Sequence, residues 1–74
     1  MRSDERITMR LKVHKVMMDE MVKAGISLEV ASARAYRDVL ALSDVLLSRR
    51  YEKIVFAEQV ADHLRLVTSI RDDV

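Results

Sequence analysis

Two histidines and one pair of carboxylates are the residues of this sequence best suited to catalysis or metal binding. His14 and His63 are its only imidazoles and lie far apart in the chain. Glu58 and Asp62 are four residues apart, so on a helix they share one face, as paired carboxylates do in general acid–base catalysis. A catalytic pair needs an apolar cleft, and a zinc site needs three or four converging ligands. The sequence supplies neither pattern. We therefore expect surface histidines and a solvated acidic face, with no metal or other cofactor.

Other common catalytic patterns need residues that this chain lacks. The absence of cysteine excludes disulfides, thiolate metal ligands and a thiol nucleophile. The single glycine, Gly25, excludes a glycine-rich phosphate-binding loop, and no serine lies in a Gly-x-Ser-x-Gly motif. We therefore expect a protein that acts by binding and not as an enzyme.

A methionine cluster with the sequence MMDEM is the strongest candidate for a binding surface. Met17, Met18 and Met21 fall within five residues, and on a helix they project in different directions. Methionine is flexible and polarisable, so it fills irregular gaps in a core and also forms adaptable binding surfaces. Both roles remain open from the sequence. Arg49 and Arg50 form a second candidate for contact with a protein partner.

The composition indicates a small helical domain that associates with itself. Of the 74 residues, 50% are apolar and 34% are charged, and the formal net charge is +1. Proline is absent, whereas the helix-favouring residues Leu, Ala, Met, Glu, Arg and Lys are plentiful. A chain this short builds a small core, and without disulfides or a metal the usual remaining support is oligomerisation. We expect one all-α domain over residues 1–74, as a homodimer.

The sequence gives no sign of a membrane or of a general affinity for nucleic acid. No apolar run approaches the ~20 residues that span a bilayer. The N-terminus lacks the apolar segment of a secretory signal, and the absence of cysteine also favours the cytoplasm. A net charge near zero gives no basic excess for nucleic acid.

Helical periodicity predicts three helices, of about residues 3–24, 27–48 and 50–70. Gly25 is typical of the position just after a helix, and Ser27 is typical of the next N-cap. Apolar residues then recur at spacings of three and four. They are Leu28, Ala31, Ala35, Val39, Leu42, Val45 and Leu46. The stripe changes phase after Ser48–Arg50 and continues through Phe56, Val60, Ala61, Leu64 and Val67. We therefore expect the second break at residues 48–50.

The opening sequence MRSDERITMRLKVHK fits two periods. As a helix it begins with Ser3 as N-cap, and Asp4 and Glu5 fall in the first turn, against the positive end of the helix dipole. As a strand it alternates, with Ile7, Met9, Leu11 and Val13 on one face and Arg6, Thr8, Arg10 and Lys12 on the other.

In the strand interpretation, residues 6–12 form a strand, a first helix begins at about Val13, and a second helix follows Gly25. This order of elements resembles that of ribbon-helix-helix repressors. The likeness covers Arg6 to about Leu40. In that family two chains pair one strand each and lay the ribbon in the DNA major groove. The resemblance implies that Arg6, Thr8 and Arg10 contact bases and that Ser27 caps the second helix near a phosphate.

The helical alternative fits the following residues better. A helix starting near Lys12 would need an N-cap there, and the chain offers Lys, Val, His and Lys, with cations at the wrong end of the dipole. We therefore expect a helix from Ser3 to Ala24. The function expected from it is a small regulatory or adaptor protein that binds another protein, with the DNA-binding repressor as the alternative.

Overall fold

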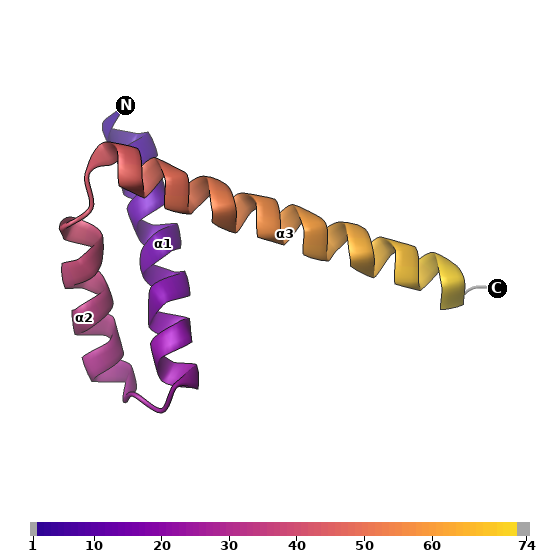
Figure 1. Cartoon of the computed structure of the whole chain (residues 1–74), viewed down its shortest axis with the longest axis horizontal. Coiled ribbons are helices and arrows are strands. Elements are labelled where there is room, and N and C mark those ends of the chain that lie inside the picture. The colour runs from indigo at the N-terminus through magenta and orange to yellow at the C-terminus, as the bar shows by residue number, and fades with distance from the viewer. Residues whose placement is uncertain (1, 73–74) are drawn as a thin grey trace.

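The computed structural model of this chain describes the backbone of residues 2–72 and the side chains of residues 2–69. Its helices are α1 (Ser3–Lys23), α2 (Leu28–Leu40) and α3 (Asp44–Asp72). α1 and α2 form an antiparallel hairpin, and α3 crosses α1 near the open end of that hairpin before running away from it (Figure 1). Residues 2–72 contain no strand, so the expected all-helical, three-helix architecture is confirmed.

The first helix settles which period governs the opening sequence. Residues 6–12 lie inside α1, where their amides bond within the helix, so the strand interpretation of these residues is wrong. The prediction of the cap differs by one residue, because Arg2 is the N-cap and Ser3 is the first helical residue. Asp4 and Glu5 occupy the first turn as expected, where the helix dipole favours acidic side chains.

Gly25 ends the first helix in the way the sequence predicts. Its φ of 95° is in the left-handed region, where a side chain would be strained. Two backbone bonds close the turn: the Gly25 amide donates to the Val22 carbonyl at 3.0 Å, and the Ile26 amide donates to the Met21 carbonyl at 3.0 Å. This is the Schellman arrangement, which satisfies the last carbonyls of a helix. It turns the chain directly into α2.

The second helix begins at its expected cap and buries one narrow face. The Ser27 hydroxyl accepts a hydrogen bond from the Val30 amide at 3.4 Å. Ala31, Ala35 and Val39, four residues apart, are buried against the rest of the chain. The two alanines present only methyl groups, so α1 and α2 can approach closely.

The break between the second and third helices lies earlier than the sequence predicts. The expected ranges 27–48 and 50–70 are wrong in this respect, because α2 ends at Leu40 and α3 begins at Asp44. Ser43 caps α3, since its hydroxyl accepts from the Leu46 amide at 3.3 Å and its carbonyl from the Leu47 amide at 2.9 Å. Residues 48–50, where we expected the break, lie within the second turn of α3.

One residue from each helix forms the centre of the core. Val13, Val39 and Leu47 are each at most 3% exposed. Partly buried apolar side chains surround them. These are Met9, Met17, Leu42, Tyr51 and Ile54. The core therefore sits where α3 crosses the hairpin, and it uses only the first part of α3.

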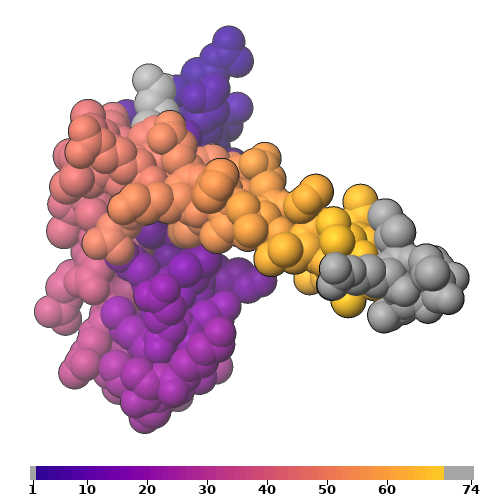
Figure 2. Space-filling view, turned by 45° about the vertical axis from the view of Figure 1, so that its right-hand side comes forward, coloured from indigo at the N-terminus to yellow at the C-terminus, as the bar shows by residue number. Residues whose placement is uncertain are grey.

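The rest of α3 projects from the hairpin. Leu47, Tyr51 and Ile54 face the core, but the side chains of residues 56–69 are all exposed. Figure 2 shows this part of α3, coloured orange to yellow, standing clear of the hairpin. The molecule thus has a compact end, formed by the three-helix junction, and an extended end, formed by one helix.

Candidate functional site

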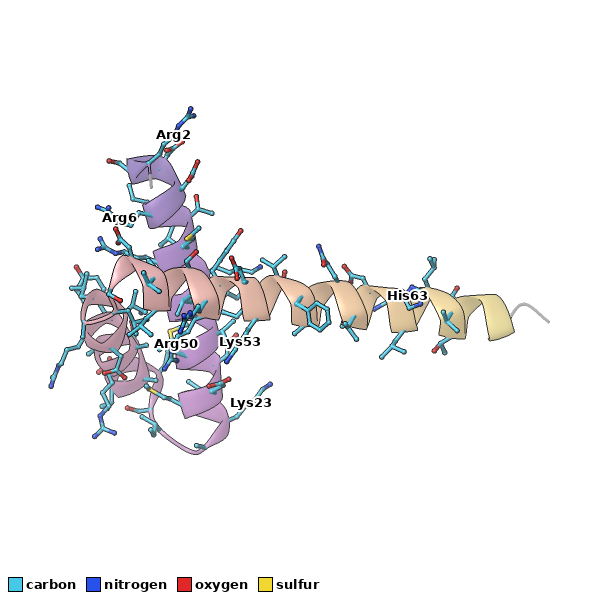
Figure 3. All side chains as sticks on the ribbon, turned by 45° about the horizontal axis from the view of Figure 1, so that its top comes forward. Arg2, Arg6, Lys23, Arg50, Lys53 and His63 are labelled. Carbon is cyan, nitrogen blue, oxygen red and sulfur yellow. The ribbon has the colours of Figure 1, made fainter. Side chains whose placement is uncertain are left out.

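The two histidines lie on different parts of the molecule. His14 packs between α1 and α2, where its Nε2 is 3.1 Å from the Ser32 carbonyl and its ring meets Tyr36 edge-on, at a centroid distance of 6.4 Å. His63 lies far along the projecting part of α3 (Figure 3). The structure therefore does not bring the two imidazoles together.

Glu58 and Asp62 also have separate partners. The Glu58 carboxylate is 2.7 Å from the Lys12 ammonium, and this ion pair ties α3 to α1. Hydrogen bonding and charge attraction from Glu58 raise the pKa of Lys12 above its ordinary value. Asp62 is 4.0 Å from Arg65 on α3 itself. Both pairs are open to solvent, so the carboxylates do not share an apolar cleft.

The part of the chain that the structure describes contains no group of three or more His, Cys, Asp or Glu side chains arranged to hold a metal ion. Within the same residues, no helix has both the length and the apolar content needed to cross a bilayer.

A groove beside the three-helix junction is the strongest candidate for a binding site. It has a volume of about 430 Å³ and opens between the end of α1, the end of α2 and the first turns of α3. Its apolar lining comes from Met17, Met21, Ala24, Ile26, Ala41 and Leu42, and its charged lining from Glu20, Asp38 and Arg50. We call this set of residues the methionine groove.

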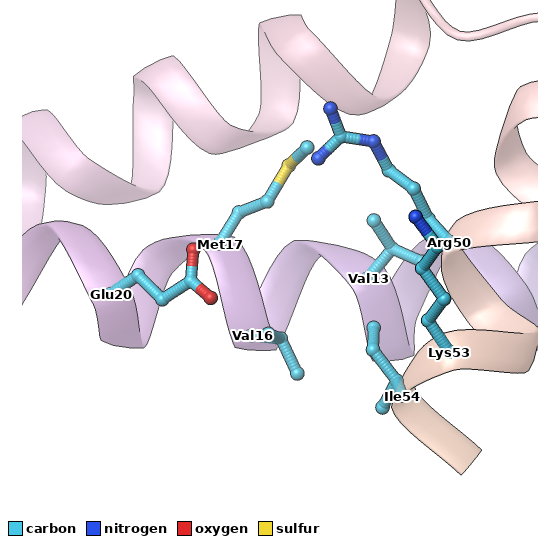
Figure 4. Close-up of a pocket in the computed structure, with 7 residues that line it drawn as sticks. All are labelled: Val13, Val16, Met17, Glu20, Arg50, Lys53 and Ile54. Carbon is cyan, nitrogen blue, oxygen red and sulfur yellow. The ribbon is translucent and has the colours of Figure 1, made fainter. Parts of the chain in front are cut away.

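A second hollow of about 400 Å³ extends the methionine groove along α3. It shares Met17, Glu20 and Arg50 with the groove and adds Val13, Val16, Lys53 and Ile54. In Figure 4, Met17 rises from α1 and Arg50 reaches from α3 into the same space below α2. Because they share Met17, Glu20 and Arg50, the two hollows adjoin, and both are lined by apolar and charged side chains.

The charges of the groove are available to a ligand. Among the described side chains, neither Glu20 nor Asp38 forms an ion pair with Arg50 or Lys53, and all four residues are exposed. Arg50 and Lys53 lie on α3 near its crossing with α1 (Figure 3). Exposed acidic and basic groups therefore line these hollows together with apolar side chains, and a partner can pair with either sign of charge.

The structure divides the five predicted partner-binding residues into two groups. Met17, Met21 and Arg50 line the methionine groove. Met18 is half-buried but does not line it, and Arg49 lies in a separate shallow depression with Asp44, Val45, Ser48 and Glu52. The division follows from helix geometry, because neighbouring residues on a helix point about 100° apart.

The sequence did not predict the groove residues that lie in the loops between α1 and α2 and between α2 and α3. Ile26 follows the glycine turn, and Ala41 and Leu42 follow α2. The Schellman turn carries a signal for Ile26, since a hydrophobic contact with the preceding helix often accompanies this motif. Ala41 and Leu42 were predicted to lie inside the second helix, so nothing placed them at its end.

The three residues expected to contact DNA on a strand have other surroundings in α1. An Arg6 Nη nitrogen is 2.9 Å from an Asp44 carboxylate oxygen, which ties the start of α3 to α1. The Thr8 hydroxyl donates to the Asp4 carbonyl at 2.9 Å. Arg10 is half-buried. As helical residues they cannot form the ribbon that the resemblance to ribbon-helix-helix repressors implies.

No protein-family model matches this chain, and no curated protein or solved structure is significantly similar to it. The function must therefore be inferred from the residues of the chain itself.

Proposed function

We propose that this protein is a cytoplasmic, non-enzymatic adaptor or regulator that binds another protein in the methionine groove and works as a homodimer. The observation that carries the proposal is the convergence of Met17, Met21 and Arg50 on one open, mostly apolar groove. Interfaces concentrate their energy in a few anchors that fill such hollows, and methionine and arginine are enriched there.

The lining of the groove defines the chemistry of the partner. Met17, Met21, Ile26 and Leu42 suit an apolar side chain, and flexible methionines adapt to its shape. Glu20, Asp38 and Arg50, one from each helix, favour flanking groups of both signs. An amphipathic segment with an apolar anchor between a basic and an acidic residue meets all of these requirements.

Two features support the proposed homodimer. The fully buried core is small, with only Val13, Ala31, Ala35, Val39 and Leu47 buried among the described side chains. Large apolar residues are exposed on all three helices, for example Leu11, Tyr36 and Phe56. Small domains without disulfides or metals commonly gain the missing stability from a second subunit.

Two neighbouring arginines allow a sharp test of the groove. Arg50 lines it and Arg49 does not, yet both are exposed on α3. We expect Arg50→Glu to weaken binding of a protein captured from the host lysate by tenfold or more, and Arg49→Glu to leave binding unchanged. Affinities would be measured by calorimetry with the purified captured protein, and helicity by circular dichroism.

A second variant in the groove tests the site independently, in case Arg50→Glu weakens binding by disturbing the fold. Met21→Glu places a carboxylate on the floor of the groove, and Lys23→Glu, near the end of the same helix, is its control. If Arg49→Glu and Arg50→Glu weaken binding equally, or if folded Met21→Glu binds like the wild type, the methionine groove is not the binding site.

A further inference from the structure

The thioethers of the methionine groove are accessible to a small oxidant. The chain has five methionines and no cysteine, so thioethers are its oxidisable sulfur groups. Met17 and Met21, one helical turn apart on α1, are half-buried, and both line the open groove. Leucine would supply a similar apolar volume without sulfur. The two sulfur atoms therefore give this surface a reactivity that its apolar character alone does not require.

Arg50 shares the groove with these thioethers and has unengaged donors. Met17 and Arg50 line both adjoining hollows, and the ends of the two side chains reach into the same space (Figure 4). Among the described side chains, no ion pair or hydrogen bond engages Arg50. A thioether sulfur is only a weak acceptor, whereas a sulfoxide carries a polar oxygen. Oxidation of Met17 would thus create an acceptor beside an unpaired guanidinium.

We propose that the methionine groove is redox-sensitive: hydrogen peroxide oxidises Met17 and Met21 to sulfoxides, and the Met17 sulfoxide then accepts a hydrogen bond from Arg50. This inference rests on the proposed function and names the regulation of the same site. In the oxidation, a lone pair of the sulfur attacks one peroxide oxygen and the O–O bond breaks. The other oxygen leaves as water, with the proton of the transferred oxygen. Sulfur loses two electrons, and the peroxide gains them.

Oxidation weakens partner binding in two ways. Each sulfoxide places a polar oxygen among the apolar side chains of the groove, and an apolar anchor that covers this oxygen removes it from water at a cost in free energy. The hydrogen bond to Met17 also draws Arg50 away from an acidic group of the partner. Neither effect requires a change in the hairpin. Sulfoxide reductases regenerate the thioether, so the loss of binding is reversible.

The chain supplies a matched control for the two groove methionines. Met18 follows Met17 directly and is also half-buried, but it does not line the groove. Met9 is less suitable, because it packs against the core, where a sulfoxide would disturb the fold. Every protein in the test therefore carries Met9→Leu, a replacement that conserves volume and removes this sulfur.

The binding test compares three proteins: the Met9→Leu parent, the parent with Met18→Leu, and the parent with Met17→Leu and Met21→Leu. Each is treated with hydrogen peroxide, freed of it and titrated by calorimetry with the untreated protein that the groove captures. Before oxidation we expect all three to bind alike. After oxidation, the parent and Met18→Leu should bind at least tenfold more weakly, whereas the protein with leucines at 17 and 21 should keep its affinity.

Three results of this comparison would overturn the proposal. Unchanged binding by the oxidised parent would show that the groove tolerates sulfoxides. Equal weakening of all three proteins would assign the effect to groups outside the groove. A loss of helicity in the oxidised parent, measured by circular dichroism, would show that the sulfoxides disrupt the fold and do not act on a folded groove.

A readout without any partner separates this inference from the proposed function. The nitrogen-15 NMR signal of the Arg50 Nε–H should shift on oxidation of the parent and of Met18→Leu, and stay unchanged when Met17 is leucine. If it does not shift in the parent, the redox inference fails, while the groove is still tested by Arg49→Glu and Arg50→Glu. If it shifts as expected but those two variants weaken binding equally, the proposed function fails and the contact of the sulfoxide with Arg50 stands.

Discussion

Leu46 and Leu47 are neighbours of the same type with opposite environments. Leu47 is 1% exposed in the cluster with Val13 and Val39, whereas Leu46 is 48% exposed. The difference follows from the position at which α3 begins, because the side chains of consecutive helical residues point about 100° apart. The effect of replacing each leucine on stability therefore tests the described packing of the three helices.

Replacing these two leucines should have very different effects on stability. Leu47→Ala removes a fully buried side chain and leaves a cavity, so we expect it to cost about 2–5 kcal/mol of unfolding free energy. Leu46→Ala, as the matched control, should cost less than about 1 kcal/mol, since nearly half of that side chain is already in water. Urea denaturation would measure both. Equal costs would contradict the packing of α3 against α1.

The sequence predicted the buried face correctly for some residues and wrongly for others. The apolar stripe after Leu28 correctly contained Ala31, Ala35 and Val39, which are all buried. It wrongly continued through Val45 and Leu46, which are exposed in α3. Periodicity shows which residues share a face only within one unbroken helix. Here the break between α2 and α3 lies inside the predicted stripe.

The boundary between α2 and α3 depends on a cap, with no glycine or proline to mark it. Ser43 and Asp44 repeat the dipeptide Ser3–Asp4 that signals the start of α1, and in both cases the acid lies in the first turn. That signal was available in the sequence but was outweighed by the unbroken apolar period. Gly25, in contrast, was recognised because its left-handed backbone favours glycine.

Two serines distinguish the observed start of α3 from the one that the sequence predicted. Ser43→Ala removes the hydroxyl that accepts from the Leu46 amide, so we expect a loss of about 0.5–2 kcal/mol. Ser48 lies inside the helix, where alanine has the higher propensity, so Ser48→Ala should be neutral or stabilise by up to about 0.5 kcal/mol. Thermal unfolding of both variants would check this, and the reverse order would place the helix start at residue 48.

The whole molecule combines a junction of three helices with a projecting helix. Its extents are 48 × 33 × 16 Å, and the longest dimension reflects the projection of α3 (Figure 1). Among the described side chains, the buried residues lie at the junction, as Val13, Val39 and Leu47 do, or between α1 and α2, as Ala31 and Ala35 do.

Periodicity predicted an apolar stripe of Phe56, Val60, Ala61, Leu64 and Val67 on the third helix, but these residues are all exposed, and α3 meets the core through Leu47, Tyr51 and Ile54. Which face of α3 meets the core depends on the tertiary crossing angle.

Amide hydrogen exchange should be slow at the junction of the three helices and fast in the projecting part of α3. We expect slow exchange around Val13, Val39 and Leu47, where opening requires loss of the core. At low micromolar concentration, residues 60–69 should exchange much faster because nothing in the monomer packs on them. Protection that is high and independent of concentration would contradict this division.

The continuity of α3 has a mechanical consequence. No glycine or proline interrupts Asp44–Asp72, so the helix is a stiff arm of about 43 Å at 1.5 Å per residue. Its base forms one wall of the methionine groove, through Arg50. A small tilt of the base, such as an occupant wedged against Arg50 would produce, is magnified at the tip in proportion to the length of the arm. A change in the tilt of α3 at the groove would thus move the far end of the helix further than its base, without any joint between them.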